Sequence, residues 1–313
     1  MAQRAVKGIG SCSCGKKKPV FGGAPVAKTI NDVYLQLFHR LRDGGDPQPS
    51  MTARELTAVA CHADRAHTAA WAHSYLDNAT VDYANILCDR VLGGEPLAYI
   101  LGEWDFYGLT FRVDKSVLIP RADTEKLCEL TIEQAKPRIS PRILDLCCGI
   151  AAAHEVEDAR VLAVDLSDGA LRLTRENAHR LGVSGRLLAM KADATMPPPG
   201  GVGPFDIIVS NPPYITRSEM AQLDHSVADF EPHEALYGGV DGLDFYRAIC
   251  ENWSDTLAHG GILLFECGWK QADAVAEILQ KYGFSDVCIE KDDAGVPRIV
   301  IGRSPREDDD LTK

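Results

Sequence analysis

Apolar residues recur along this chain with two different spacings, and the change from one to the other falls near residue 94. Before that point they follow the three-to-four-residue spacing of amphipathic helices, beginning with Ile30, Val33 and Leu37. Thr52 and Glu55 have the spacing of a capping box that starts a second helix. The pattern predicts a small helical domain with helices over residues 30–41, 52–60, 69–76 and 80–92.

After residue 94 the apolar positions form shorter runs. Alternating apolar residues around Tyr107-Gly108 predict a β-hairpin. From residue 142 onward, predicted strands alternate with helical stretches, which are clearest over residues 168–181 and 244–257. This alternation indicates a mostly parallel sheet covered on both faces, closed by an antiparallel pair. The predicted strands cover residues 143–146, 161–166, 187–190, 205–210, 261–265, 286–290 and 298–302.

The predicted fold class is therefore α/β, with a Rossmann-like, mostly parallel seven-stranded sheet that ends in an antiparallel hairpin and is preceded by a small helical domain. The predicted divisions are an N-terminal tail over residues 1–28, the helical domain over 29–93, a linker with the hairpin over 94–122, the α/β domain over 123–303 and an acidic tail over 304–313.

The charge and composition of the chain limit the kinds of partner that it is expected to bind. The 313-residue chain has a formal net charge of −12, which argues against a nucleic-acid-binding face and suits a basic protein partner or a small substrate. No apolar stretch reaches the roughly 18 residues that cross a bilayer, and residues 1–23 lack a signal-peptide core. We therefore expect a cytoplasmic protein without a membrane partner, whose ten cysteines are reduced thiols. Cys12-x-Cys14 has no second pair at a ligand spacing, so we predict no metal site.

The tetrapeptide Asn211-Pro212-Pro213-Tyr214 directly follows the predicted strand over residues 205–210, at the edge of the sheet where ligands bind. A planar NH2 group is a poor nucleophile because its lone pair is delocalised. Two acceptors, the Asn211 side-chain oxygen and the Pro212 carbonyl, favour a nitrogen whose lone pair points outward. The prolines stiffen the loop, and the Tyr214 ring offers a surface for stacking. These four residues form the predicted catalytic group.

Acidic residues mark the ends of other predicted strands. Asp145 and Gly149 lie at the exit of the first strand, where a nucleotide-like cofactor docks in sheets of this kind. Asp165 ends the second strand, where a carboxylate holds ribose hydroxyls, although a helix-capping role fits equally well. Asp193 follows the third strand and is either near the adenine or an ordinary loop residue.

Several short motifs between residues 29 and 303 resemble one known family. They are Gly94-Glu-Pro-Leu-Ala-Tyr-Ile-Leu-Gly102, Phe106-Tyr-Gly108, Leu118-Ile-Pro-Arg121, Asp123-Thr-Glu125, Asn211-Pro-Pro-Tyr214, Phe230-Glu-Pro232, Ala235-Leu236, Asp241-Gly-Leu243 and Glu266-x-Gly268. Together they make the chain similar to the class I, S-adenosylmethionine-dependent methyltransferases of the PrmC/HemK type, the release-factor glutamine N5-methyltransferases.

This resemblance implies S-adenosyl-L-methionine as the cofactor and peptide chain release factors as the protein substrate. It implies methyl transfer to the side-chain amide of the glutamine in a Gly-Gly-Gln loop, with the helical domain helping to hold the substrate. Glu231 and Glu266 are candidates for the pocket wall or structural carboxylates. The expected cofactor-binding residues are Asp145, Cys147, Cys148, Gly149, Asp165, Asp193, Ala194 and Asn211.

Two other functions stay open at this point. An adenine-N6 nucleic-acid methyltransferase also uses an Asn/Asp-Pro-Pro-aromatic loop, but it needs a basic groove and space for a flipped base. A non-catalytic binder of release factors is the second, because Asp145-Leu-Cys-Cys-Gly149-Ile-Ala has one glycine where the family has Gly-x-Gly. The crossover behind it is short as well, yet long enough for the fold to close.

Overall fold

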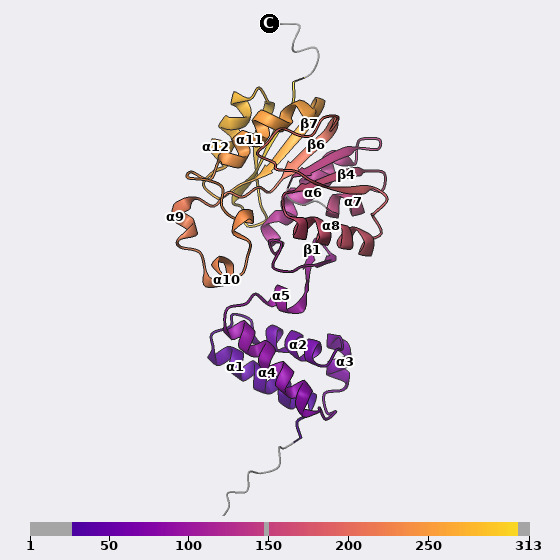
Figure 1. Cartoon of the computed structure of the whole chain (residues 1–313), viewed down its shortest axis with the longest axis vertical. Helices are drawn as coiled ribbons and strands as arrows, with labels where there is room; N and C mark the ends of the chain where they lie inside the picture. Colours follow the sequence, from indigo (N-terminus) through magenta and orange to yellow (C-terminus); the bar gives the residue numbers. More distant parts are fainter. Residues whose placement is uncertain (1–26, 147–149, 306–313) are drawn as a thin grey trace, which may run out of the picture.

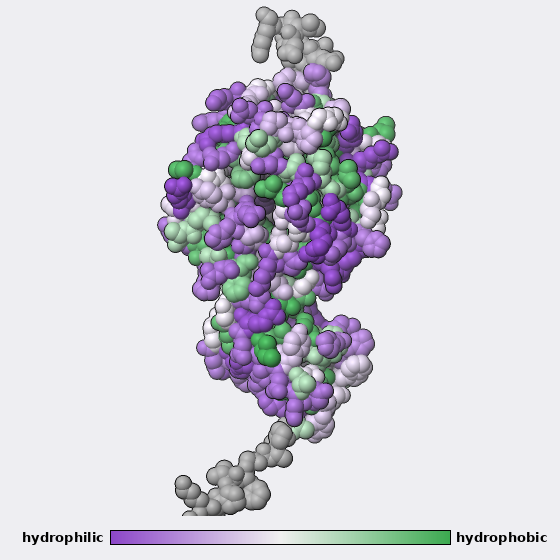
Figure 2. All heavy atoms as spheres, viewed as in Figure 1, coloured by the Kyte–Doolittle hydropathy of each residue, from purple (hydrophilic) through white to green (hydrophobic). Residues whose placement is uncertain are grey.

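A computed structural model describes residues 27–146 and 150–305. The Cys12-x-Cys14 segment, residues 147–149 and the end of the acidic tail lie outside the described residues. The chain forms an elongated molecule with a helical lobe at one end and a sheet-containing lobe at the other (Figure 1). A narrower waist joins the two lobes in the space-filling view (Figure 2). Within the described residues, no helix is both long and apolar enough to span a membrane.

The helical lobe has four helices, three of which pack around one apolar cluster. Thr29 and Asp32 form a capping box at the start of the first helix, and Val33, Leu37 and Leu56 are among the residues buried between helices. The helices are α1 (Ile30–Asp43), α2 (Pro49–Ala60), α3 (Arg65–Ala70) and α4 (Asn78–Leu92).

Two helix starts differ from the sequence prediction. Helix α2 begins at Pro49, because proline is well suited to the first helical position, so Thr52 lies inside the helix and its hydroxyl donates to Asp46. Helix α3 begins earlier than predicted because Asp64 caps it by accepting from the His67 N–H at 2.8 Å. The predicted helix over residues 69–76 is wrong beyond Ala70: the carbonyl groups of Ala72 and Ser74 accept hydrogen bonds from the first N–H groups of α1.

The waist consists of a short helix, α5 (Leu97–Leu101), and the predicted hairpin of β1 (Glu103–Phe106) and β2 (Leu109–Arg112). Tyr107 and Gly108 both have positive φ angles, as a two-residue turn between twisted strands requires. Tyr99 is buried there and its hydroxyl donates to the Val117 carbonyl at 2.6 Å. The Glu95 carboxylate, also buried, pairs with Arg90 at 2.7 Å and with Lys115 at 3.2 Å.

The second lobe is a seven-stranded sheet in the order β5-β4-β3-β6-β7-β9-β8, and only the last two pairings are antiparallel. This confirms the predicted sheet and its closing hairpin. The strands are β3 (Arg142–Leu146), β4 (Arg160–Asp165), β5 (Leu187–Lys191), β6 (Phe205–Ser210), β7 (Leu257–Glu266), β8 (Ser285–Lys291) and β9 (Pro297–Arg303). The strand order reverses between β3 and β6, which is where open sheets of this type bind ligands.

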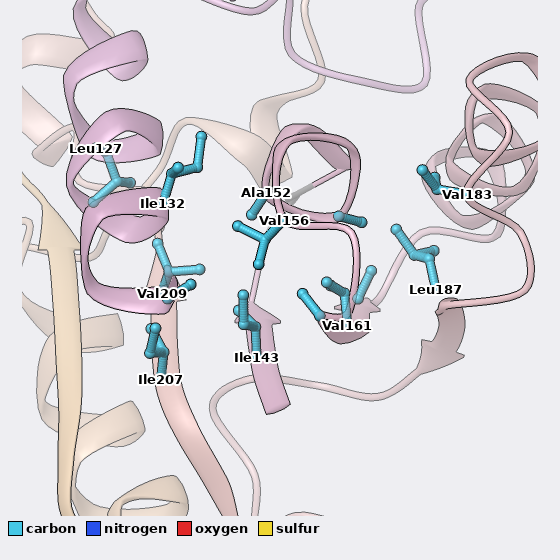
Figure 3. Close-up of a cluster of buried hydrophobic side chains, with 14 of the residues drawn as sticks. Leu127, Ile132, Ile143, Ala152, Val156, Val161, Val183, Leu187, Ile207 and Val209 are labelled. Atoms are coloured by element: carbon cyan, nitrogen blue, oxygen red, sulfur yellow. The ribbon is translucent and has the colours of Figure 1, made fainter. Parts of the chain in front are cut away.

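Helices cover both faces of the sheet because successive strand residues point to opposite sides. Ile143 and Ile207 pack under α6 (Glu125–Ala135) and α7 (Ile150–Glu155), as Figure 3 shows, and α8 (Asp168–Arg180) extends this layer. Leu144 and Ile208 face α11 (Asp244–Trp253) and α12 (Ala272–Lys281). Shorter elements are η1 (Ala122–Thr124), α9 (Arg217–Met220), α10 (His225–Ala228), η2 (His233–Ala235) and η3 (Ser254–Thr256).

The shortened crossover after β3 does close, as predicted. Strands β3 and β4 pair in parallel from Arg142↔Arg160 to Leu146↔Val164, and the six-residue α7 is the helix in the described part of the segment between them. The Arg186 guanidinium donates to the carbonyl groups of Ala153 and Val156 and so ties the end of α7 to the strand beside β4.

Candidate active site

A cavity of about 750 Å³ opens where the carboxyl ends of β3, β4, β5 and β6 meet. The hairpin and the segment before α6 form its opposite wall, through residues such as Phe111, Arg121 and Thr124. Six of the predicted site residues line it: Asp145, Asp165, Asp193, Ala194, Asn211 and Pro213. These residues come from four different strand ends, so the parallel order of the sheet brings them together.

The other predicted site residues do not share this position. Pro212 is buried and Tyr214 half-buried, and neither belongs to the cavity lining. The ring of Tyr214 packs instead against the apolar cluster beneath α11 and α12. Cys147, Cys148 and Gly149 lie outside the described residues.

Asp165 is the carboxylate at the end of β4, and it is not the cap of the following helix. Ser167 caps α8 by accepting from the Ala170 N–H, while Asp165 accepts from the Ser167 N–H at 2.8 Å. This bond orients the Asp165 side chain at the cavity wall. Burial raises the pKa of Asp165, and the backbone N–H groups of Ser167 and Leu166 partly oppose that rise.

The neighbouring wall suits the nucleoside half of S-adenosylmethionine. A carboxylate such as Asp165 accepts hydrogen bonds from ribose hydroxyls, and Leu166 beside it keeps 54% of its surface exposed, so it offers an apolar face to a flat ring. The loop with Asp193 and Ala194 is fixed: Asp193 accepts from the Thr195 N–H at 2.8 Å, and the Trp253 indole donates to the Ala194 carbonyl at 3.0 Å. The accepting carboxylate and the apolar face of this wall therefore fit this cofactor.

Asn211 directly follows β6 and is held by a residue from far along the chain. Its Nδ2 donates to the Thr124 Oγ1 at 3.1 Å. Thr124 stands at the N-cap position of α6 but makes no side-chain capping bond there, so its hydroxyl is used for Asn211 instead. Because the amide group is planar, Oδ1 of Asn211 lies on the side away from Thr124.

Glu266 lies behind Asn211 and not in the cavity wall. It is the last residue of β7 and is 1% exposed. Burial raises the pKa of the Glu266 carboxyl to about 7, while hydrogen bonds from the Thr124 and Asn211 side chains and the charge of Arg298 oppose the rise. Within the described part of the chain, its Oε2 has no hydrogen-bond partner.

Arg121 is a cavity residue that the sequence placed only within a motif. Its guanidinium pairs with the buried Glu231 carboxylate, which holds the cation at the wall. Glu231, like Glu266, thus stands behind the lining as a support. Arg121 keeps further N–H groups that can donate to carbonyl oxygens of a substrate.

Comparison with known proteins decides the family. The chain matches the PrmC N-terminal domain over residues 32–102 and an RMKL-like methyltransferase domain over residues 123–226. It is 35% identical to the release factor glutamine methyltransferase of Vibrio cholerae serotype O1 over 290 residues, which cover 89% of this chain and 98% of that protein. The chain belongs to the release factor glutamine methyltransferase family.

A second member of the family, from Koribacter versatilis, is 34% identical over 291 residues, covering 88% of this chain and 99% of the relative. These matches confirm the resemblance drawn from the motifs. Among solved structures, the catalytic domain of hMettl16 in complex with the MAT2A 3'UTR hairpin 6 aligns with a TM-score of 0.51 at 15% identity, covering 64% of this chain and 77% of that one. That likeness concerns the fold alone.

The buried carboxylate of Glu266 is expected to lower the free energy of unfolding at high pH. Glu266 has a pKa of about 7 in the folded protein and an ordinary value of 4.5, so the folded state binds the proton more tightly and stability is lost as pH rises from about 4.5 to about 7. Glu266→Gln is expected to raise the free energy of unfolding by up to about 3 kcal/mol at pH 8 and by less than about 1 kcal/mol at pH 5. Urea unfolding at both pH values measures this difference.

The same substitution at Glu277, exposed on α12, provides the control and should have little effect at either pH. An equal gain from Glu266→Gln at pH 5 and pH 8 would mean that the Glu266 carboxylate is not the source.

Proposed function

We propose that the protein transfers a methyl group from S-adenosylmethionine to the side-chain amide nitrogen, N5, of the glutamine in the Gly-Gly-Gln loop of peptide chain release factors. The observation that carries this proposal is the placement of Asn211. Thr124 holds the Asn211 amide at the wall of a cavity that Asp165, the expected ribose ligand, also lines. The names of the relatives support the same substrate class.

When bound, S-adenosylmethionine supplies a methyl group that its sulfonium already activates. The residues of the chain then have to position the amide nitrogen and stabilise its developing charge. We propose that Asn211 Oδ1 and the Pro212 carbonyl accept the two N–H bonds of the amide, so that the nitrogen lone pair points into the cavity. Pro213 keeps this loop stiff, and Tyr214 anchors it by packing against the core. The extra proton leaves to water after the transfer.

The cofactor would be held by residues from three strand ends. Asp165 takes the ribose hydroxyls, and Asp193 and Ala194 lie beside the ring, with Asp145 at the exit of β3 on the other side. Asn211 borders both the cofactor and the substrate space. The neighbouring Cys147, Cys148 and Gly149 keep their expected role toward the cofactor as part of this proposal.

The helical domain is proposed to hold the protein substrate in front of the cavity. The net charge of −12 favours a basic partner over nucleic acid, whose phosphates it repels. An adenine methyltransferase is therefore the weaker proposal, and we place the protein in the cytoplasm with the translation apparatus.

A competition in one tube tests the substrate class. Protein, radiolabelled S-adenosylmethionine, a release factor and duplex DNA are incubated together, and label is expected in the release factor alone. A release factor whose Gly-Gly-Gln glutamine is replaced by alanine is the control and should stay unlabelled. Label in the DNA and none in the protein would exclude the proposed function. Calorimetric titration of the same preparation with S-adenosylmethionine separates an enzyme from a non-catalytic binder, which would give no binding heat.

A further inference from the structure

Asn211 and Glu266 occupy equivalent positions at the ends of two neighbouring strands. Strands β6 and β7 pair in parallel, with Ser210 opposite Phe265. Asn211 follows Ser210 and Glu266 follows Phe265, so the sheet itself places a buried carboxylate beside the amide. Thr124 completes the group from η1: its hydroxyl accepts from Asn211 Nδ2 at 3.1 Å, and both side chains lie close enough to Glu266 to stabilise its ionised form.

The hydrogen-bonding capacity of these three groups determines how the Asn211 amide is turned. Above its pKa of about 7 the Glu266 carboxylate is ionised and only accepts hydrogen bonds, so in this form the Thr124 hydroxyl donates its single proton to it. The hydroxyl oxygen then has only acceptor sites left, and these can be matched by the Asn211 NH2 group but not by its oxygen. With Nδ2 directed to Thr124, Oδ1 is left on the opposite side of the amide.

We propose that Glu266, directly and through the Thr124 hydroxyl, is a positioning residue that keeps Oδ1 of Asn211 turned toward the substrate amide and that requires an amide, not a carboxylate, at position 211. This inference rests on the proposed function. An amide turned the other way would present NH2 to the substrate NH2 group, and two donors cannot bind each other.

The charges around Glu266 fit such a role. Arg298 on β9 approaches it, but that guanidinium also pairs with Asp123 and with Asp292, each at 2.9 Å. Asp123 on η1 repels the carboxylate, and the Tyr246 hydroxyl on α11 donates to the Glu266 backbone carbonyl at 2.9 Å, not to its side chain. Burying a carboxylate this way is unfavourable for folding. Because the buried Glu266 carboxylate destabilises the fold, we explain its presence by its effect on the orientation of the Asn211 amide.

A matched pair of variants at position 124 tests the relay. Thr124→Val removes the hydroxyl and is expected to lower kcat about tenfold or more, while KM for the release factor and the calorimetric Kd for S-adenosylmethionine change less than about threefold. Thr124→Ser keeps the hydroxyl and should recover most of the activity lost in the valine variant. Equal rates for the serine and valine variants would overturn the proposal.

Exchange of the donor and the acceptor gives a sharper test. Asn211→Asp sets a second carboxylate against Glu266, where like charges repel, and activity is expected to fall by about a hundredfold or more. Adding Glu266→Gln supplies a new NH2 donor to Asp at position 211, and the double variant should regain at least about tenfold over Asn211→Asp alone. A double variant that is no better than the single one, with all proteins folded by urea unfolding, would refute the role of Glu266.

A readout without turnover separates this inference from the proposed function. The side-chain NH2 signals of Asn211, assigned by their absence in Asn211→Ala, are expected to exchange slowly with solvent in the unmodified protein and in Thr124→Ser. They should exchange at least about tenfold faster in Thr124→Val. Fast exchange in all three proteins would overturn the relay even if the release factor is methylated. Slow exchange in a protein that methylates nothing would support the relay and defeat the proposed function.

Discussion

Asn211→Ala is expected to reduce methyl transfer to the release factor by about 10²–10³-fold, because the substitution removes one fixed acceptor from the transition state. Oδ1 of Asn211 is proposed to orient the substrate amide and to stabilise the positive charge that grows on its nitrogen. The loss should appear in kcat as well as in kcat/KM, since the interaction strengthens as the charge develops. Single-turnover rates with saturating S-adenosylmethionine measure it.

The fold should tolerate this change. Asn211 is half-buried in a loop, and Thr124, which accepts from its side chain, can still donate its hydroxyl to Glu266 in the variant. The urea midpoint and the Kd for S-adenosylmethionine are therefore expected to stay close to those of the unmodified protein. Gln280→Ala, which removes an exposed side-chain amide from α12, is the matched control. A rate above about a tenth of normal in Asn211→Ala would show that the side-chain oxygen is not the orienting group.

Asp165→Ala is expected to weaken the binding of S-adenosylmethionine by about a hundredfold or more. Two ribose hydroxyls would lose a charged acceptor, and each hydrogen bond to a charged group contributes about 1.5–3 kcal/mol. Isothermal titration calorimetry measures the change in Kd directly. Asp165→Asn keeps the shape and one acceptor oxygen, so its affinity should fall between those of the alanine variant and the unmodified protein.

Asp168→Ala is the control for the loss of one negative charge. Asp168 starts α8 only three residues further on, but its side chain is 80% exposed and pairs with Lys191. Its removal is expected to change Kd by less than about threefold, because exposed ion pairs are weak and screened. Equal losses in the two alanine variants would point to long-range charge and not to a ribose contact at Asp165.

Much of the fold could be predicted from the sequence because each strand of the parallel sheet is a short apolar run. Each covering helix shows apolar positions at a spacing of three to four residues. The failures occurred where a single polar group decided the outcome. The true start of α3 depends on the cap formed by Asp64, and the segment after it is needed to accept the first N–H groups of α1. Periodicity carries no information about either.

The site residues that lie at the ends of strands could be predicted from the sequence. Asp165 and Asn211 end or follow neighbouring strands of a parallel sheet, so their convergence follows from topology. Thr124 could not be assigned in this way, because it meets Asn211 across 87 residues of chain. Arg121 likewise depends on the buried Glu231, which is 110 residues away. Contacts at such separations need the folded structure.

Contacts at the waist join the helical lobe to the sheet-containing lobe. Gly94 approaches His225 and Phe230 so closely that even a methyl group there would stand 3.1 Å from the histidine ring, and a few residues away Glu95 shares its carboxylate between Arg90 and Lys115. Pulling the lobes apart would leave that carboxylate without its partners and uncover the packed side chain of Tyr99. These contacts oppose a separation of the two lobes. Under the proposed function, a release factor held by the helical lobe has to reach the cavity across this waist.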